Sequence, residues 1–344
     1  MKKAAGEFHR SKGEVMSSRS FDRRSFLRLS AASIGTGALL QFFPSFGAST
    51  AHAKTISNLL GRRTGEAPSP FSIVQLSDTH VGFNGPPDPL GTAAFERAVE
   101  TINALTPQPD LILFTGDLTH DSEDSGEHAK RFAKFKEIAG RLRVQKRFYV
   151  PGEHDAALDG GTLFREHLGE MHRSFDHKGV HFIALDNVSA GRPAVGKAQL
   201  AWLKSDLARY SKETPIVVFT HRPLFDLKPE WEWFTSDGDA VMNVLAPYDA
   251  VTVLYGHIHR EQHTTLGNAQ HHAARSLIFA FPDPATTAEK KPLPFDASQP
   301  FRNLGIRRIT DSGARLAIDD VELTKREVSG ANGVAQMLKQ GELS

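Results

Sequence analysis

Short apolar runs alternate with longer amphipathic segments through the middle of the chain. Runs rich in β-branched and aromatic residues predict strands, and segments with helical spacing of apolar residues predict helices. The predicted strands are Ser72–Leu76, Leu111–Thr115, Arg147–Val150, Val180–Leu185, Ile216–Thr220 and Val251–Leu254. The predicted helices cover about 91–105, 127–139, 161–168, 197–209 and 239–245. This alternation is typical of an α/β fold.

The carboxyl-terminal part has a different pattern. Residues 282–300 are rich in proline and small polar residues, which predicts a surface loop. Two β-like runs follow, 304–309 and 314–323, on either side of a short Asp-Ser-Gly sequence. They predict a hairpin that completes a sheet. We expect one catalytic domain over residues 71–325, preceded by a linker at 54–70 and followed by a flexible tail at 326–344.

The amino terminus has the layout of an export signal. Arg23-Arg24 precedes a mildly apolar stretch, Leu29–Phe46, and then Ala51-His52-Ala53. This order predicts a twin-arginine signal peptide over residues 1–53, and hence export to the periplasm by the twin-arginine translocation machinery. The alternative is a basic amphipathic helix or a membrane anchor. Gly35 and Gly37 weaken a helix, and the apolar run is short for a bilayer span.

Composition removes several classes of function. The 344 residues include 41 basic and 40 acidic side chains, so net charge gives no reason to expect a nucleic-acid partner. The chain has no cysteine, which excludes disulfides, thiolate metal sites and cysteine nucleophiles. No glycine-rich phosphate loop ending in Gly-Lys-Ser/Thr occurs. Any metal ion must therefore be held by nitrogen and oxygen atoms.

Acidic residues and histidines follow five of the predicted strands. Ligands bind in α/β proteins at the crevice beyond the carboxyl ends of the strands. Each fragment alone is weak, because Asp-x-His and Gly-Asp are common in turns. Together, five such fragments in order predict one metal centre. They are Asp78-Thr79-His80, Gly116-Asp117, Gly152-Glu153-His154-Asp155, His221 and Gly256-His257-Ile258-His259.

In these motifs the chain resembles the calcineurin-like metallophosphoesterase superfamily over residues 71–282. The family's blocks run Asp-x-His, Gly-Asp, Gly-Asn-His-Asp/Glu, His and Gly-His-x-His. The resemblance implies a four-layer α/β/β/α sandwich of two mixed sheets and a site at the strand ends. It also implies roles for individual residues. One metal would be bound by Asp78, His80 and His259, and the second metal by Glu153, His221 and His257. Asp117 would bridge the two metals. His154 would contact the phosphate, with support from Asp155.

This donor set has a definite chemistry. Imidazole and carboxylate ligands suit manganese, iron, cobalt or zinc. Two such ions about 3.5–4 Å apart can activate a water and hold phosphoryl oxygens. We therefore expect hydrolysis of a phosphate monoester or diester, with the cyclic-nucleotide phosphodiesterases as the most similar branch. The alternative is a non-catalytic or weakly active protein that binds metal or phosphate on the same fold.

Glu153 departs from the family pattern, which has asparagine at this position. Two divalent ions, two aspartates and a hydroxide sum to a formal charge of plus one, and a glutamate lowers the sum to zero. A neutral centre attracts a phosphate dianion less strongly. Three interpretations remain open: a trivalent iron in a mixed-valent pair, a less charged substrate such as a phosphodiester, or a tolerated variant.

His120 lies three residues after Asp117, where purple acid phosphatases carry a tyrosine ligand. Its presence predicts that no tyrosinate colour would arise with bound iron. His120 either lines the cleft or lies on a surface loop, and the sequence slightly favours the loop.

Aromatic residues and two further histidines lie downstream. Trp231, Trp233 and Phe234 form either a stacking surface for a substrate or a small cluster under a long loop. His271 and His272 occur in a stretch that looks like a polar turn. We expect them to be solvated and to take no part in metal binding.

Overall fold

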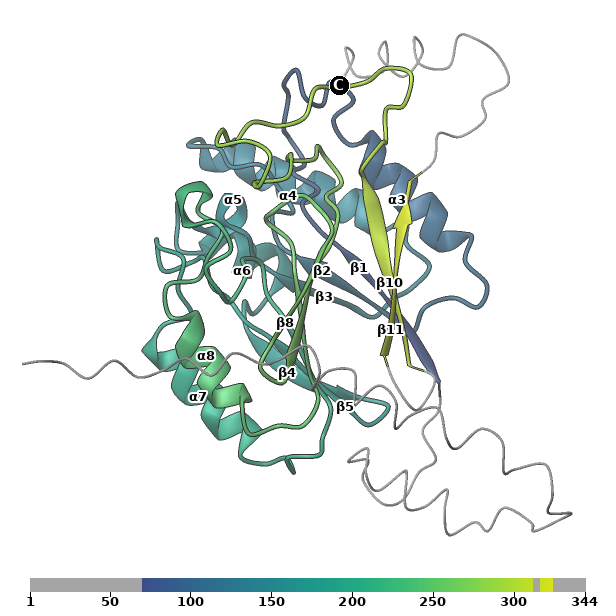
Figure 1. Ribbon diagram of the computed structural model, residues 1–344. Helices are drawn as coiled ribbons and strands as arrows, with labels where there is room; N and C mark the ends of the chain where they lie inside the picture. The colour runs from purple at the N-terminus through teal and green to yellow at the C-terminus, as the bar shows by residue number, and fades with distance from the viewer. Residues whose placement is uncertain (1–69, 312–315, 324–344) are drawn as a thin grey trace, which may run out of the picture. The chain divides into compact units, whose positions relative to one another are not determined.

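The computed structural model describes residues 70–311 and 316–323, which form two stacked β-sheets with helices outside them (Figure 1). The predicted signal peptide at 1–53 and the predicted tail at 326–344 lie outside the described residues, as does the linker except for residue 70. Among the helices that are described, none is both long and apolar enough to cross a membrane.

The first sheet has the strand order β11-β10-β1-β2-β3. Strands β1, β2 and β3 are parallel, and β10 pairs with β1 and β11 in antiparallel fashion. The predicted terminal hairpin is confirmed, because β10 and β11 are neighbours in this sheet. The strands are β1 (Phe71–Leu76), β2 (Leu111–Thr115), β3 (Arg147–Val150), β10 (Gly305–Asp311) and β11 (Leu316–Glu322).

The second sheet has the order β4-β5-β6-β7-β9-β8. Its four central strands run parallel, and β4 and β8 are antiparallel strands at the two edges. Both sheets are therefore mixed. The strands are β4 (Arg173–His177), β5 (Val180–Ala184), β6 (Ile216–Phe219), β7 (Val251–Tyr255), β8 (Gln262–Leu266) and β9 (Ala269–Ala273).

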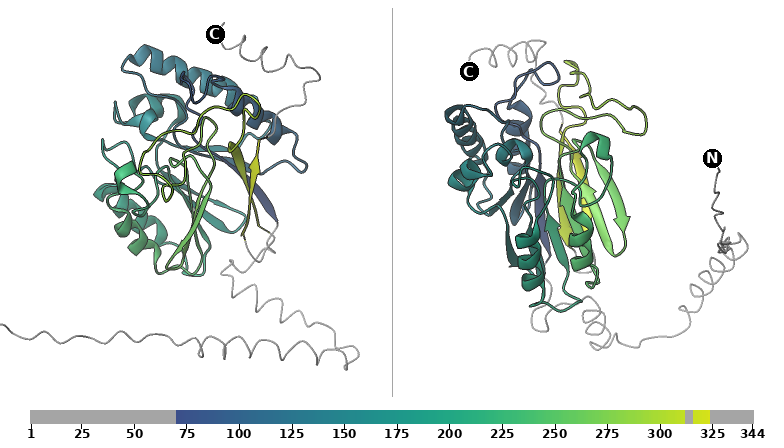
Figure 2. Two further views of the ribbon diagram at one scale, coloured as in Figure 1. Left: turned by 45° about the horizontal axis from the view of Figure 1, so that its top comes forward. Right: turned by 90° about the vertical axis from the view of Figure 1, so that its left-hand side faces the viewer.

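Helices cover the outer faces of the two sheets (Figure 2). Helices α3 and α4 pack on the first sheet, whereas α7 and α8 pack on the second. The short helix α5 begins directly beyond β3, at the strand ends. The bounds are α3 (Ala93–Asn103), α4 (Ser125–Ala139), α5 (Glu153–Ala156), α6 (Thr162–Leu168), α7 (Lys197–Leu207), α8 (Gly238–Leu245) and a 3-10 turn η1 (Pro229–Trp231).

Alternation along the strands explains the layering. In β1, Val74 and Leu76 belong to the core beneath α3 and α4, whereas Ile73 belongs to the core between the sheets, together with Phe182 and Phe219. Successive side chains of a strand point to opposite faces, so a strand covered on both faces is apolar throughout. The predicted α/β/β/α sandwich of two mixed sheets is confirmed.

Three strands and one short helix differ from the sequence interpretation. Strands β4, β8 and β9 and helix α5 were not predicted, because β4, β8 and β9 carry polar or histidine residues at many positions and α5 spans four residues. The expectation that His271 and His272 are solvated is wrong. They lie on β9, between β7 and β8, and are 0% and 9% exposed.

The tryptophans form a buried cluster. Trp231 and Trp233 are 2% and 0% exposed and pack with Tyr255, Ile258 and Phe281. A side chain covered to this extent offers no face to a substrate. For the two tryptophans, the small cluster under a long loop is therefore the correct interpretation, and the stacking surface is wrong; Phe234 is half-buried and lies outside this cluster.

Candidate metal centre

Both sheets contribute to one cluster of polar side chains. Asp78 and His80 follow β1, Asp117 follows β2, and Glu153 follows β3. From the second sheet, His221 follows β6, and His257 and His259 follow β7. The parallel strands of both sheets end at this edge. As a result, Asp78 contacts His259, although the two residues are 181 positions apart in sequence. All seven predicted ligands meet here.

The first half of the cluster contains Asp78, His80, Asp117 and His259, whose donor atoms all lie within 4.8 Å of one another. His80 Nε2 lies 3.4 Å from Asp117 Oδ2 and 3.3 Å from His259 Nε2. His259 Nε2 lies 3.3 Å from Asp78 Oδ1. Each of the four side chains is at most 4% exposed.

The second half contains Asp117, Glu153, His221 and His257, again with donor atoms within 4.8 Å of one another. His221 Nε2 lies 3.3 Å from Asp117 Oδ2 and 2.8 Å from Glu153 Oε2. His257 Nδ1 lies 2.9 Å from Glu153 Oε1. Because Asp117 belongs to both halves, its carboxylate would contribute to both positions if each half held a cation.

Backbone carbonyls fix which nitrogen of three histidines is free. His221 Nδ1 donates to Thr115 O at 2.7 Å, and His259 Nδ1 donates to Phe279 O at 2.9 Å. His257 instead donates from Nε2, to Glu232 O at 3.1 Å. The opposite ring nitrogen then presents its lone pair to the cluster. Such an outer hydrogen bond is usual for histidines that bind metals, because it sets the tautomer and the ring orientation.

The second half of the cluster is suited to a cation. Burial lowers the pKa of His257 to about 4, so its ring is neutral near pH 7 and its Nδ1 lone pair faces a carboxylate oxygen. Glu153 Oε2 and His221 Nε2 are buried and lie 2.8 Å apart, yet their geometry is not that of a hydrogen bond. Both atoms therefore lack a proper partner within the described residues. A bound cation would satisfy both atoms once the His221 ring is neutral.

The neighbouring carboxylates change the pKa of His221. Burial opposes a charged imidazole, but Asp117 and Glu153 outweigh it and raise the pKa of His221 well above its usual value. A proton on Nε2 and a metal ion compete for the same lone pair. Metal binding here would therefore release a proton.

Five of the seven predicted ligands have left-handed backbone conformations. The φ angles are 55° for Asp78, 39° for His80, 49° for Asp117, 64° for His257 and 50° for His259. This region costs a residue with a Cβ atom on the order of 1–3 kcal/mol. The surrounding sheets must hold these turns in place, and such strain is concentrated at functional sites.

Glycines allow the turns to approach one another. A Cβ atom on Gly152 would overlap Asp117 Oδ1, and one on Gly256 would overlap Ser77 Oγ. A Cβ atom on Gly116, whose φ is 89°, would lie 2.8 Å from Gly152 N. The glycine before three of the ligand positions thus permits close approach, to backbone atoms at Gly116 and Gly152 and to side chains at Gly256.

His154 lies at the cluster but has a different carboxylate partner from the predicted one. Its ring pairs through Nδ1 with Asp121 Oδ1, and its backbone N–H donates to Asp117 Oδ1 at 3.0 Å. Asp155 is fully buried and accepts hydrogen bonds from the backbone of Gly152, Leu118 and Thr119. The prediction that Asp155 supports the His154 side chain is wrong. Asp155 ties the start of α5 to the turn after β2.

Charge around His154 favours its protonated form. Burial lowers the pKa of His154, but the carboxylates of Asp117, Asp121 and Glu153 outweigh burial and raise it to about 9. The side chain is 30% exposed, so it reaches solvent at the mouth of the cluster. A charged imidazole there can bind a phosphoryl oxygen or donate a proton.

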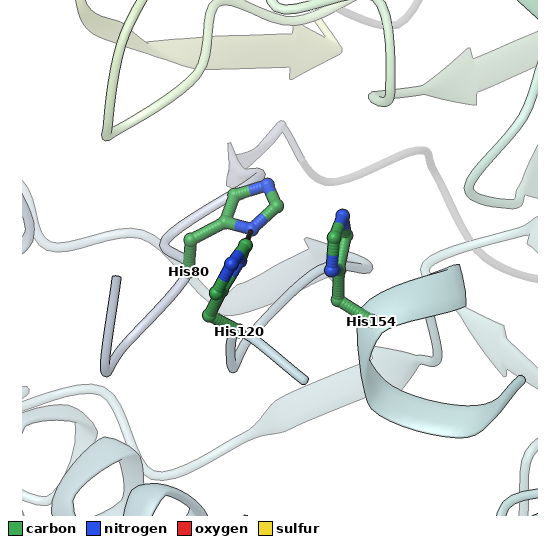
Figure 3. Close-up of side chains that lie close together, drawn as sticks. All are labelled: His80, His120 and His154. Carbon is green, nitrogen blue, oxygen red and sulfur yellow. Dashed lines mark hydrogen bonds between the residues drawn. The ribbon is translucent and has the colours of Figure 1, made fainter. Parts of the chain in front are cut away.

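His120 lies beside the cluster and not away from it. Figure 3 shows its ring next to that of His80, with His154 facing both, and its Nδ1 lies 3.3 Å from His80 Nδ1. The rings of His120 and His154 stack with centroids 4.6 Å apart. Burial, together with the charge of His154, lowers the pKa of His120 to about 4. His120 thus stands on a loop with 31% of its side chain exposed, and its ring lies against the cluster.

Comparisons with known proteins agree with this arrangement. The sequence profile of the calcineurin-like phosphoesterase family matches residues 71–261. A 3′,5′-cyclic-nucleotide phosphodiesterase of Nostoc sp. is 25% identical over 227 residues, which cover 63% of this chain and 82% of that protein. An Arcobacter nitrofigilis protein named "probable glycerophosphodiester phosphodiesterase" is 30% identical over 214 residues, covering 57% of this chain and 74% of that protein.

A solved structure supports the fold. The crystal structure of a dimetal phosphatase from Danio rerio superposes with a TM-score of 0.54 at 13% identity, covering 74% of this chain and 99% of that chain. At this identity the likeness concerns the arrangement of sheets and helices alone.

Proposed function

Because the chain belongs to the calcineurin-like phosphoesterase family, we propose that its two ligand clusters hold a pair of transition-metal ions for the hydrolysis of a phosphate ester. One observation carries the proposal: Asp117 is shared by two sets of four side chains, seven residues in all, of which only Glu153 is more than 4% exposed, and the ligand atoms of each set lie within 4.8 Å of one another. The donors are imidazoles and carboxylates, which suit manganese, iron or zinc. In this proposal Asp78, His80 and His259 serve one ion, and Glu153, His221 and His257 serve the other.

The protein side chains have distinct parts in the reaction. When bound, a metal pair supplies Lewis acidity and an activated water near neutral pH. The carboxylates hold negative charge beside the ions, and the backbone carbonyls of Thr115, Phe279 and Glu232 keep three histidine rings oriented. Asp121 holds a proton on His154 Nδ1 and leaves the Nε2–H for the leaving-group oxygen. Attack is direct, with no covalent intermediate on the protein.

The substrate is a small phosphate ester. The relatives named above act, by their names, on cyclic nucleotides and glycerophosphodiesters, which are diesters. We therefore propose a phosphodiester as the first class to test, with monoesters as the comparison. The alternative function is binding of metal or phosphate without turnover.

The test uses purified protein stripped of metal and then supplied with Mn²⁺, Fe²⁺ or Zn²⁺. Hydrolysis of bis-p-nitrophenyl phosphate and p-nitrophenyl phosphate is measured for the wild type and for Asp117→Asn. We expect metal-dependent turnover, and a loss of at least about a hundredfold in the variant, because the bridging charge is lost. The matched control is Asp124→Asn, since Asp124 caps α4 by accepting from Gly126 and Glu127 N–H groups and asparagine caps equally well. Tight Mn²⁺ binding without turnover on a broad ester panel would favour the alternative.

We also propose export by the twin-arginine pathway, which rests on residues outside the described part of the chain. Its support is Arg23-Arg24 followed by the apolar stretch 29–46. Replacing both arginines by lysine should leave the protein inside the cell, as cell fractionation would show. Unchanged periplasmic recovery would refute the pathway.

A further inference from the structure

Arg222 lies beside Glu153, directly after the predicted ligand His221. Arg222 is 6% exposed, and Nη2 of its guanidinium lies 3.2 Å from Glu153 Oε1. Nη1 of the same group donates to Glu232 O at 2.7 Å. A permanent positive charge is thus buried against the one ligand that departs from the family pattern.

A closed network holds this arginine in place. Glu232 O accepts from Arg222 Nη1 and also from His257 Nε2, while Glu153 Oε1 faces Arg222 Nη2 and His257 Nδ1. The backbone of Arg222 is fixed as well, because Asn187 Nδ2 donates to its carbonyl at 3.0 Å and Asn187 Oδ1 accepts from its N–H at 3.3 Å. These contacts hold the Arg222 guanidinium in a fixed position in the second half of the cluster.

The formal charges show what this arginine does. Two divalent ions, two aspartates, a hydroxide and Glu153 sum to zero, and Arg222 returns the sum to plus one. We propose that Glu153 and Arg222 act as one charge-compensated ligand unit, which gives the centre the net charge of a centre with a neutral amide ligand. This inference rests on the proposed metal centre.

The proposal concerns which substrates and ions the centre accepts. With Arg222 in place, neither a trivalent ion nor a less charged substrate is needed to offset Glu153. Two divalent ions should then bind a doubly charged phosphate. Arg222 would act as a specificity-determining residue through the charge it adds beside the phosphate position.

The test is a double-mutant cycle with Glu153→Gln, Arg222→Gln and the double variant. Calorimetry measures Mn²⁺ binding to the metal-free protein, and then inorganic phosphate binding to the Mn²⁺-saturated protein. Arg222→Gln should weaken phosphate binding about tenfold, a conservative share of the Coulomb interaction between charges a few ångströms apart. Glu153→Gln should weaken Mn²⁺ binding by about the same factor and strengthen phosphate binding. In the double variant phosphate affinity should return to within about threefold of wild type.

Two controls separate charge from folding. Arg222→Lys keeps the charge and should retain phosphate affinity to within about threefold, even if it lowers the melting temperature. Arg141→Gln removes a positive charge from the exposed end of α4, where Arg141 pairs with Glu96 and Glu137, and should change neither affinity.

Three results would overturn the proposal. They are unchanged phosphate affinity in Arg222→Gln, equal loss in Arg222→Lys, or a double variant in which the single effects fail to cancel. Absence of Mn²⁺ binding to the wild type would remove the metal centre itself, and with it the proposed function. Mn²⁺ binding to the wild type together with any of these three results would remove this inference alone.

Discussion

Gly256 allows a direct test of the close packing at the strand ends. A Cβ atom at this position would lie 2.6 Å from Asp78 Oδ2 and 3.1 Å from Ser77 Cβ, and it would overlap Ser77 Oγ. Ordinary contact begins at 3.4 Å, so Gly256→Ala must displace the Asp78 carboxylate by about 0.8 Å, the difference between 3.4 and 2.6 Å. Metal–ligand distances tolerate about 0.2 Å. We therefore expect Mn²⁺ affinity, measured by calorimetry, to fall about 10- to 100-fold.

A second substitution separates the two overlaps. Overpacking costs about 1–3 kcal/mol, so Gly256→Ala should also lower the melting temperature by several degrees. Adding Ser77→Ala removes the hydroxyl but leaves Asp78 displaced. The double variant should therefore recover stability and not metal affinity. Gly126→Ala, in the first turn of α4, is the control and should be neutral or stabilising. Wild-type Mn²⁺ affinity in Gly256→Ala would refute the reasoning.

Three further predictions use other features. Asp121→Asn removes the carboxylate against His154, so kcat on bis-p-nitrophenyl phosphate should fall about 10- to 100-fold while calorimetric Mn²⁺ affinity is retained; lost Mn²⁺ binding would contradict this separation. Burial raises the pKa of Asp88 from 3.8 to about 7, despite the hydrogen bond from Leu90 N–H. Its contribution to stability is therefore complete below pH 3.8 and is lost as the pH rises through about 7. In urea unfolding, Asp88→Asn should be more stable than wild type at pH 8, by up to about 4 kcal/mol, and equal to it at pH 4; the same difference at both pH values would refute this. Removing metal with a chelator should lower the melting temperature measured by differential scanning calorimetry. Adding Mn²⁺ at about 100 times its dissociation constant should raise the melting temperature by about 5–10 °C. An unchanged melting temperature would argue against metal binding to the folded state.

The sequence was sufficient to predict those strands that are continuous apolar runs. Strands β1, β2 and β6 are mostly apolar on both faces because each lies between a helix layer and the other sheet, and their ends were predicted to within one residue. The order of ligands after these strands was readable for the same reason. Each ligand follows an apolar run, and the parallel strands bring the ligands to one edge.

Contacts between loops could not be predicted. Asp121 meets His154 only because the turn after β2 lies against α5, and Arg222 meets Glu153 across the two sheets. No periodicity in the chain encodes either contact. His154 was assigned to Asp155 as its neighbour in sequence, but Asp155 serves backbone N–H groups at the start of α5. Strand β9 was not predicted because histidine is a polar residue type, yet His271 and His272 are buried on this strand, which lies between β7 and β8.

The metal centre combines two costs that the sheets must offset. Five left-handed ligands together cost on the order of 5–15 kcal/mol, comparable with the whole stability of an ordinary domain. The centre also gathers three carboxylates, Asp78, Asp117 and Glu153, in a site that excludes most solvent. Apolar layers on both sides of each sheet hold the turns, and Arg222, together with the cations proposed above, would offset the carboxylates. The glycines before Asp117, Glu153 and His257 follow from the same demand, because only a residue without a side chain lets such crowded turns meet.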